Sequence, residues 1–235
     1  MQLFFDSHIK KEDKKFTFDK EESRHIIRVL RKKEGDILYI TNGKGILFTS
    51  IISLANDKRC TVNIEKVLEQ KNKLTYKLHI AIAPTKNNQR LEWFLEKATE
   101  IGISEITPII CEHSERKVVK IERLEKVLIS AMKQSKRFYL PKLNQSITLK
   151  KFLEINYNDL KFIAHCEDEK KQTLKEKLKP NQDLIVLIGP EGDFSLSEIL
   201  LALEKQFIPI SFGNSILRTE TAGVVAAQSV AFINE

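Results

Sequence analysis

Two segments near the C-terminus, LIVLIGPEGDFSLSEI (184–199) and PISFGNSILRTETAG (209–223), decide the fold class. Each starts with a short apolar run typical of a buried strand, turns through a glycine-containing loop, and continues as a helical pattern. Ser195 and Glu198 have the spacing of a capping box at the start of the first helix. Strand–loop–helix units of this kind predict an α/β domain with a mostly parallel sheet and helices on both faces.

The same rhythm extends upstream from these two segments. Apolar runs predict strands at residues 76–84, 105–111, 160–166, 183–189 and 207–213. Helices are expected from Asn87 or Asn88 to Gly102, and then at residues 121–138, 195–205 and 217–233, because apolar residues recur there at helical spacing. Short, wholly apolar strands are typical of parallel sheets that are covered on both faces.

The first 70 residues have a different pattern, which predicts a small, mostly β module. A helix is expected between Asp19, a good N-cap with Glu22 as its capping-box partner, and Gly35. Three β-like runs follow at residues 37–40, 46–52 and 60–68. Residues 69–74 are polar and predict a linker. The chain therefore divides into domains at residues 1–70 and 74–235.

Charge and composition narrow the class of partner. The net charge of +7 favours a polyanionic partner such as a nucleic acid. The basic residues considered for phosphate contact are Arg24, Arg28, Arg31 and Lys32 on the first helix, and Lys133, Lys136 and Arg137 on a later one. A solvated surface is the ordinary explanation for any one of them. No apolar run is long enough to span a bilayer, and no cysteine pair has metal-ligand spacing, so we expect a cytoplasmic protein without a metal.

The loops that follow residues 184–188 and 207–213 predict a ligand pocket. In open α/β sheets, ligands bind outside the carboxyl ends of the strands. Neither loop carries a Walker lysine or a GxGxxG fingerprint, so a nucleotide-type phosphate site is not indicated. On residue chemistry alone, an adenosine-type pocket and two ordinary strand-to-helix turns both remain open.

Five segments in order resemble the RsmE family of SPOUT RNA methyltransferases: HIIRVLRKKEGD (25–36), KNNQRLEWFLEKATEIGISEITPI (86–109), SERKVVKIERLEKVLISAMKQSKRFYLPKL (114–143), GPEGDFS (189–195) and ILRTETAG (216–223). The resemblance implies a PUA-like β-barrel domain followed by a trefoil-knotted methyltransferase domain that forms a homodimer. It implies S-adenosylmethionine-dependent methylation of N3 of a uridine in 16S (small-subunit) ribosomal RNA. One departure is Ser215, where the family often has a basic residue.

The resemblance also implies which residues form the site. Those expected around S-adenosylmethionine are His165, Ile188, Gly189, Pro190, Glu191, Gly192, Phe212, Gly213, Ile216, Leu217 and Arg218. Because N3 of uridine carries a proton, the reaction needs a base and an anion-stabilising cation. Arg218 is the expected cation, and Glu220 or Glu191 the expected base. A purely structural role is open for each: an Arg218–Glu220 ion pair, loop ordering by Glu191, and burial of His165.

Two other functions compete with this interpretation. One is a SPOUT enzyme that methylates a ribose 2′-hydroxyl, which would need no N3 deprotonation. The other is a non-catalytic RNA-binding or ribosome-assembly factor. The GPEG and RTET segments argue against the second, because a protein that only binds RNA needs no cofactor pocket.

Overall fold

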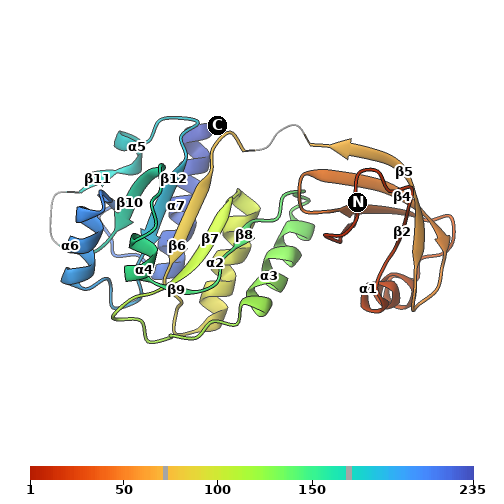
Figure 1. Ribbon diagram of the computed structural model, residues 1–235, viewed down its shortest axis with the longest axis horizontal. Helices are drawn as coiled ribbons and strands as arrows, with labels where there is room; N and C mark the ends of the chain where they lie inside the picture. The colour runs from red at the N-terminus through yellow and green to blue at the C-terminus, as the bar shows by residue number, and fades with distance from the viewer. Residues whose placement is uncertain (71–73, 168–170) are drawn as a thin grey trace. The chain divides into compact units, whose positions relative to one another are not determined.

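The computed structural model describes residues 1–70, 74–167 and 171–235. The chain forms two compact units: Met1–Lys73 with Met132–Leu140, and Leu74–Ala131 with Pro141–Glu235. Residues 132–140 thus belong to the first unit, whereas the boundaries expected from the sequence place them in the second domain. Each unit has its own sheet (Figure 1).

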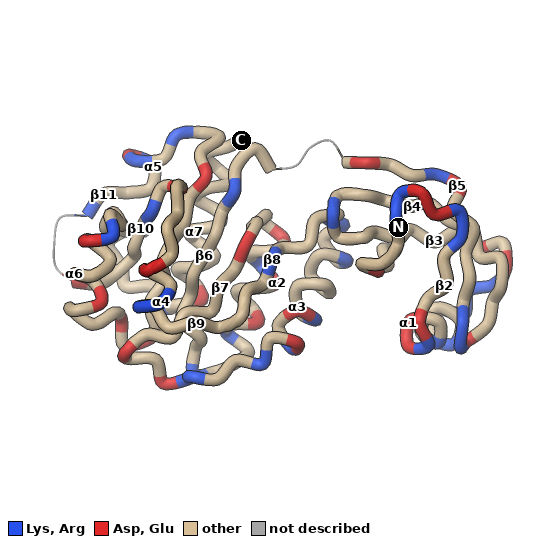
Figure 2. Tube along the Cα trace, viewed as in Figure 1, with Lys and Arg blue, Asp and Glu red and all other residues tan. Residues whose placement is uncertain are grey.

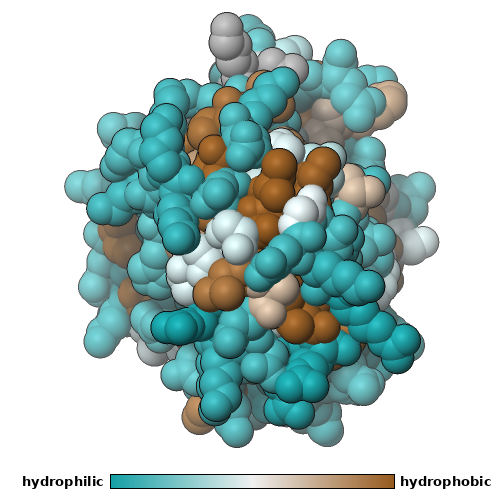
Figure 3. Space-filling view, turned by 90° about the vertical axis from the view of Figure 1, so that its right-hand side faces the viewer, coloured by the Kyte–Doolittle hydropathy of each residue, from teal (hydrophilic) through white to brown (hydrophobic). Residues whose placement is uncertain are grey.

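The first unit is built on a five-stranded sheet in the order β1-β3-β4-β5-β2. Its strands are β1 (Leu3–Phe5), β2 (Lys15–Thr17), β3 (Ile37–Thr41), β4 (Ile46–Leu54) and β5 (Thr61–Glu69). The pair β1–β3 is parallel and the other pairs are antiparallel. Phe4, Ile40 and Phe48 lie on one face and form the core of this unit with the helix residue Ile26. Four apolar side chains of this unit are exposed: Val29, Ile37, Leu54 and Leu68. Figure 3 shows hydrophobic patches among hydrophilic side chains on the face that it views.

The helical segment of the first unit is shorter than the sequence predicts. It consists of α1 (Lys20–Arg24) and a π-helical turn, η1 (His25–Val29). The expected N-cap is confirmed, since the Asp19 side chain accepts a hydrogen bond from the Glu22 amide at 2.8 Å. The helix ends before Gly35 because Arg31 adopts a left-handed conformation (φ 55°). Arg24 and Arg28 lie in this segment, whereas Arg31 and Lys32 follow its end, so the expectation that all four lie on the first helix was wrong.

The second unit contains an eight-stranded sheet in the order β11-β13-β10-β12-β6-β7-β8, with β9 beside β7. Every pairing between these strands is parallel, as their apolar runs predict. The strands are β6 (Leu78–Ile82), β7 (Glu105–Ile110), β8 (Lys142–Leu143), β9 (Ile147–Thr148), β10 (Leu160–Ala164), β11 (Gln172–Thr173), β12 (Leu184–Ile188) and β13 (Ile208–Ser211).

Helices cover both faces of this sheet (Figure 1). They are α2 (Asn88–Ile101), α3 (Ile121–Gln134), α4 (Leu149–Leu153), α5 (Leu174–Lys177), α6 (Leu196–Glu204) and α7 (Thr219–Asn234). On β12, Ile185 and Leu187 pack against α4 and α6 in one core cluster. The alternate residues face the other side, where α7 contacts β6, β12 and α2.

Gly223 of α7 packs inside the second unit, against α2. A Cβ atom there would lie 2.6 Å from the Phe94 ring on α2. The expected N-cap of α2 is confirmed at Asn87, and the capping box of α6 at Ser195. The helix expected at residues 121–138 ends at Gln134 instead, because Lys136 is left-handed (φ 55°). Among the described helices, none has the length and apolar character to cross a membrane.

Candidate functional site

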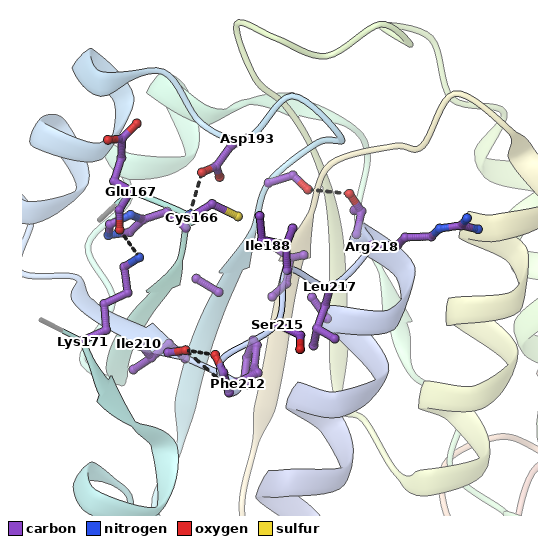
Figure 4. A pocket seen from close by; sticks show the side chains of 18 of the residues that line it. Cys166, Glu167, Lys171, Ile188, Asp193, Ile210, Phe212, Ser215, Leu217 and Arg218 are labelled. Atoms are coloured by element: carbon purple, nitrogen blue, oxygen red, sulfur yellow. Dashed lines mark hydrogen bonds between the residues drawn. The ribbon is translucent and has the colours of Figure 1, made fainter. Parts of the chain in front are cut away.

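A cavity of about 650 Å³ lies at the carboxyl ends of β10, β12 and β13 (Figure 4). Its walls come from segments far apart in the sequence. The end of β10 contributes His165 and Cys166, the loop after β12 contributes residues 189–193, and the loop after β13 contributes residues 212–218. This is the edge of a parallel sheet where the sequence predicts a ligand pocket.

The loop after β12 is held by its own side chains. The Asp193 amide donates to the Pro190 carbonyl oxygen at 2.9 Å and closes a tight turn in which Asp193 has φ 59°. Asp193 Oδ2 accepts a hydrogen bond from the Cys166 amide at 2.6 Å, so this loop is joined to the end of β10 (Figure 4). Glu191 Oε1 accepts from the Lys86 amide at 3.0 Å and ties the same loop to the segment after β6.

The loop after β13 is joined to the loop after β12 by one buried hydrogen bond. The Thr219 hydroxyl, at the start of α7, donates to the Gly189 carbonyl oxygen at 3.0 Å. Gly213 turns the chain with φ 132°, a conformation that favours glycine, and its amide donates to Ser211 Oγ. Both loops are therefore ordered by contacts within the protein, which leaves the cavity preformed.

The structure brings most of the expected cofactor residues together. All of them line the cavity except Gly192. The carbonyl oxygen of Gly192 lies 3.0 Å from His113 Nδ1. His165 is buried at the cavity wall. Ser215, where the family often has a basic residue, also lines the cavity. Lining residues that the sequence did not single out include Lys171, Asp193, Asn214, Thr219 and Ala222.

The three catalytic candidates lie in different surroundings. Arg218 borders the first cavity and also a second one of about 300 Å³. Glu220 lines only the second cavity, where it is buried and its Oε1 lies 3.7 Å from Arg90 Nε. Among the described residues the ion-pair partner of Glu220 is thus Arg90, not Arg218. Glu191 borders the first cavity and orders its loop through the Lys86 amide.

All of the basic residues considered for RNA contact belong to the first unit. Two of them are engaged by acidic neighbours: Arg28 Nη2 lies 2.7 Å from Asp57, and Lys133 Nζ lies 3.6 Å from Glu22. Lys136 and Arg137 follow the end of α3 rather than lying on it. Figure 2 shows blue and red residues close together in this unit rather than a stretch of one sign.

The cysteines show no sign of nucleophile activation. Burial raises the pKa of the Cys60 thiol to about 11 and also raises the pKa values of Cys111 and Cys166. Cys166 borders the cavity, and its pKa is raised further by the carboxylate of Asp193. In the described parts of the chain, no three His, Cys, Asp or Glu side chains come together as a possible metal site.

Known proteins with the same organisation identify the family. Residues 70–231 match the model of the RNA methyltransferase domain, and residues 18–65 match that of the RNA methyltransferase PUA domain. The ribosomal RNA small subunit methyltransferase E of Buchnera aphidicola is 35% identical over 90% of this chain and 85% of that protein. This chain belongs to the RsmE family.

Solved structures extend the family likeness to the whole fold. A Porphyromonas gingivalis protein is 39% identical and superposes with a TM-score of 0.91, covering 100% of this chain and 98% of that chain. The ribosomal RNA small subunit methyltransferase E of Neisseria gonorrhoeae, solved with bound S-adenosylmethionine, is 25% identical. It has a TM-score of 0.85 and covers 100% of this chain and 98% of that chain. The SPOUT-type α/β fold and the N-terminal PUA domain expected from the resemblance are confirmed.

Proposed function

We propose that this chain transfers a methyl group from S-adenosylmethionine to N3 of a uridine in 16S ribosomal RNA of the small subunit. The observation that carries the proposal is the preformed cavity between the GPEG and ILRTET loops. It is supported by family membership, since relatives are named as small-subunit rRNA methyltransferases and one was solved with S-adenosylmethionine.

The chemistry of the cavity suits this cofactor. About 650 Å³ falls in the range of small-molecule sites. Ile188, Ile210 and Leu217 offer an apolar surface for a purine ring, and residues 212–216 line the same cavity. Asp193 and Glu191 supply negative charge where a sulfonium or an ammonium group can be neutralised. S-adenosylmethionine, when bound, supplies an electrophilic methyl group whose leaving group is a neutral thioether.

The protein must prepare N3 of the uridine for attack. N3 carries a proton, and its removal places negative charge on the base, shared with O2 and O4. We assign the proton acceptor to Glu220, because it is buried, lines the second cavity together with Arg218 and Arg90, and lies outside the first cavity. Arg218 stabilises the developing anion, since a guanidinium is always charged and donates several hydrogen bonds.

Glu191 has a different role in this proposal. Its Oε1 accepts the Lys86 amide, so it holds the loop after β12 in the shape that the cofactor needs. This leaves Glu191 as a cofactor-site residue and Glu220 as the base. The notion that Arg218 and Glu220 only neutralise each other loses support, because Arg90 is the cation paired with Glu220.

The two units have separate tasks in the proposed function. The first unit, with its PUA domain and basic residues, binds ribosomal RNA, and the second unit carries the methyl transfer. We also propose a homodimer and a cytoplasmic location, where the ribosomal substrate is assembled. The dimer is tested by the mass of the protein in dilute solution: a monomer that keeps full activity contradicts it.

One experiment tests the reaction itself. Small subunits that lack the modification are incubated with the protein and methyl-labelled S-adenosylmethionine, and the label is located by mass spectrometry of RNA fragments. We expect a single methyl group on N3 of a uridine. Label on a ribose 2′-oxygen would refute the N3 assignment in favour of the related SPOUT activity. Cofactor binding by calorimetry without any transfer would favour a non-catalytic RNA-binding factor.

A variant tests the base assignment. Glu220→Gln keeps the shape of the side chain but removes the proton acceptor, so we expect kcat to fall by roughly 100- to 10,000-fold. Binding of S-adenosylmethionine is expected to be unchanged, because Glu220 does not line that cavity. Glu96→Gln, at a partly exposed residue of α2 that lines neither cavity, is the matched control. Equal kcat in both variants contradicts the assignment.

A further inference from the structure

The second cavity adjoins the site just described and contains groups that the cofactor does not need. It measures about 300 Å³ and is lined by Asn87, Gln89, Arg90, Trp93, Glu220 and Thr221, with Arg218 shared between the two cavities. Its residues come from α2 and from the start of α7, so both walls belong to the second unit. Arg90 and Trp93 were not among the residues singled out from the sequence.

Arg218 marks the junction of the two cavities. Its side chain extends away from Ile188 and Leu217, toward the helix α2 (Figure 4). The guanidinium therefore serves the second cavity, whereas the chain on either side of it borders the first. A methyl donor in the first cavity and an acceptor in the second would meet next to this residue.

The carboxylate of Glu220 indicates that the second cavity binds a ligand with a hydrogen-bond donor. The residue is only 6% exposed, and its Oε2 atom is buried without a hydrogen-bond partner. Its other oxygen lies 3.7 Å from Arg90 Nε, beyond hydrogen-bond distance. A buried carboxylate oxygen without a donor is costly, and a ligand N–H group placed in the cavity would satisfy it.

Trp93 provides the remaining element of a base-binding site. Its side chain is 42% exposed, although a large aromatic residue on a helix is ordinarily covered. A nucleobase that is splayed out of its stack gains most of its lost stacking energy on such a surface. The cavity thus combines an aromatic platform with two arginines and a carboxylate.

We propose that this second cavity binds the target base itself and selects uracil; the inference rests on the proposed function. The edge of uracil presents acceptor, donor and acceptor groups at O2, N3–H and O4. Arg90, Glu220 and Arg218 offer the complementary donor, acceptor and donor groups. Cytosine has an unprotonated N3, so it would offer no hydrogen to the Glu220 carboxylate. Its amino group would also face an arginine, which places two hydrogen-bond donors against each other.

The reaction balances with these groups. The N3–H bond breaks as the proton passes to Glu220, and the electron pair stays on N3. That pair then forms the N3–methyl bond while the bond between the methyl carbon and sulfur breaks, with its electrons going to sulfur. Arg90 is a positioning residue in this scheme, and Trp93 holds the ring in place.

Kinetics on small subunits lacking the modification test the inference. Trp93→Leu and Arg90→Ala are expected to lower kcat/KM for RNA by about tenfold or more, the value of one stacked base. Trp93→Phe should recover most of the activity. Arg123→Ala, at an exposed arginine of α3 that pairs with Glu92 of α2, is the matched control and should match the wild type. Calorimetry with S-adenosylmethionine should give one affinity for every variant, which also establishes that each is folded.

A second readout does not depend on methyl transfer. Trp93 is the only tryptophan in the chain, so its fluorescence reports on the cavity. Uridine 5′-monophosphate is expected to quench it at lower concentration than cytidine 5′-monophosphate, and Arg90→Ala should abolish the difference. Equal quenching by both nucleotides, or a Trp93→Leu enzyme as active as Arg123→Ala, overturns the inference. If the wild type transfers no methyl group at all, the proposed function fails, and the titration alone decides this site.

Discussion

His79 on β6 should make the second unit sensitive to mild acid. The side chain is 2% exposed, and its Nε2 atom lies 2.7 Å from Thr107 Oγ1. The pKa of His79 is lowered from 6.5 to about 4, chiefly by burial beside Phe152 and Tyr157. The charge of Glu105 opposes this shift, and the charges of Lys77 and Lys142 add to it. Between pH 6.5 and about 4, His79 is therefore neutral in the folded protein but protonated in the unfolded chain.

The change in the free energy of unfolding follows from the linkage between proton binding and folding. Between pH 6.5 and about 4 the unfolded state binds one more proton at His79, so the free energy of unfolding falls as the pH falls through this window. Above pH 6.5 the contribution is fully present. The whole shift corresponds to about 3 kcal/mol, of which about 2 kcal/mol is lost between pH 7 and pH 5.

Urea denaturation at a series of pH values measures this loss. The fluorescence of Trp93, which lies in the same unit, reports the transition. His79→Gln keeps a side chain able to bond Thr107 but does not titrate, so its difference from the wild type isolates the histidine. We expect the wild type to lose about 2 kcal/mol more than His79→Gln between pH 7 and pH 5. Parallel losses in the two proteins would refute the reasoning.

Three further outcomes are expected. Gly223→Ala should lower the free energy of unfolding by about 1 kcal/mol in urea, because the clash with Phe94 outweighs the gain in helix propensity. Thr219→Val removes the buried hydrogen bond between the two loops, and should cost about 1–2 kcal/mol and weaken S-adenosylmethionine binding in calorimetry; unchanged affinity would contradict it. Replacing Arg24 and Arg31 with alanine should reduce the slope of log affinity for rRNA against log salt by roughly 1.5; an unchanged slope would exclude both as phosphate contacts.

Much of the fold could be predicted because its signals are local. Asn87 and Ser195 cap their helices through neighbours two or three residues away, so the sequence alone locates these helix starts. Wholly apolar strands such as β12 report burial on both faces and hence a parallel sheet. The location of the first cavity was predictable for a related reason, since the loops that line it directly follow strand ends that meet at one edge of the sheet.

The predictions that were wrong or missing concern features without a signal in the neighbouring sequence. Arg31 and Lys136 end their helices in a left-handed conformation that normally favours glycine or asparagine, so the periodic pattern seemed to continue past them. The second cavity was missed because Arg90 and Glu220 lie on α2 and α7, which become neighbours only through the order of the strands between them. The trefoil knot is a similar case: general topology rules argue against knots, and it stays a prediction from the resemblance.

The order of strands in the second sheet has a consequence for how the protein is made. β12 lies between β10 and β6, and Lys77 at the start of β6 bonds to Asp183, 106 residues later in the chain. Residues of α7, the last helix, line both the first and the second cavity. A chain still emerging from the ribosome therefore cannot hold the methyl donor until α7 has been synthesised. Such long-range pairing slows folding. Incomplete nascent chains of this protein would therefore not methylate the ribosomes that synthesise them.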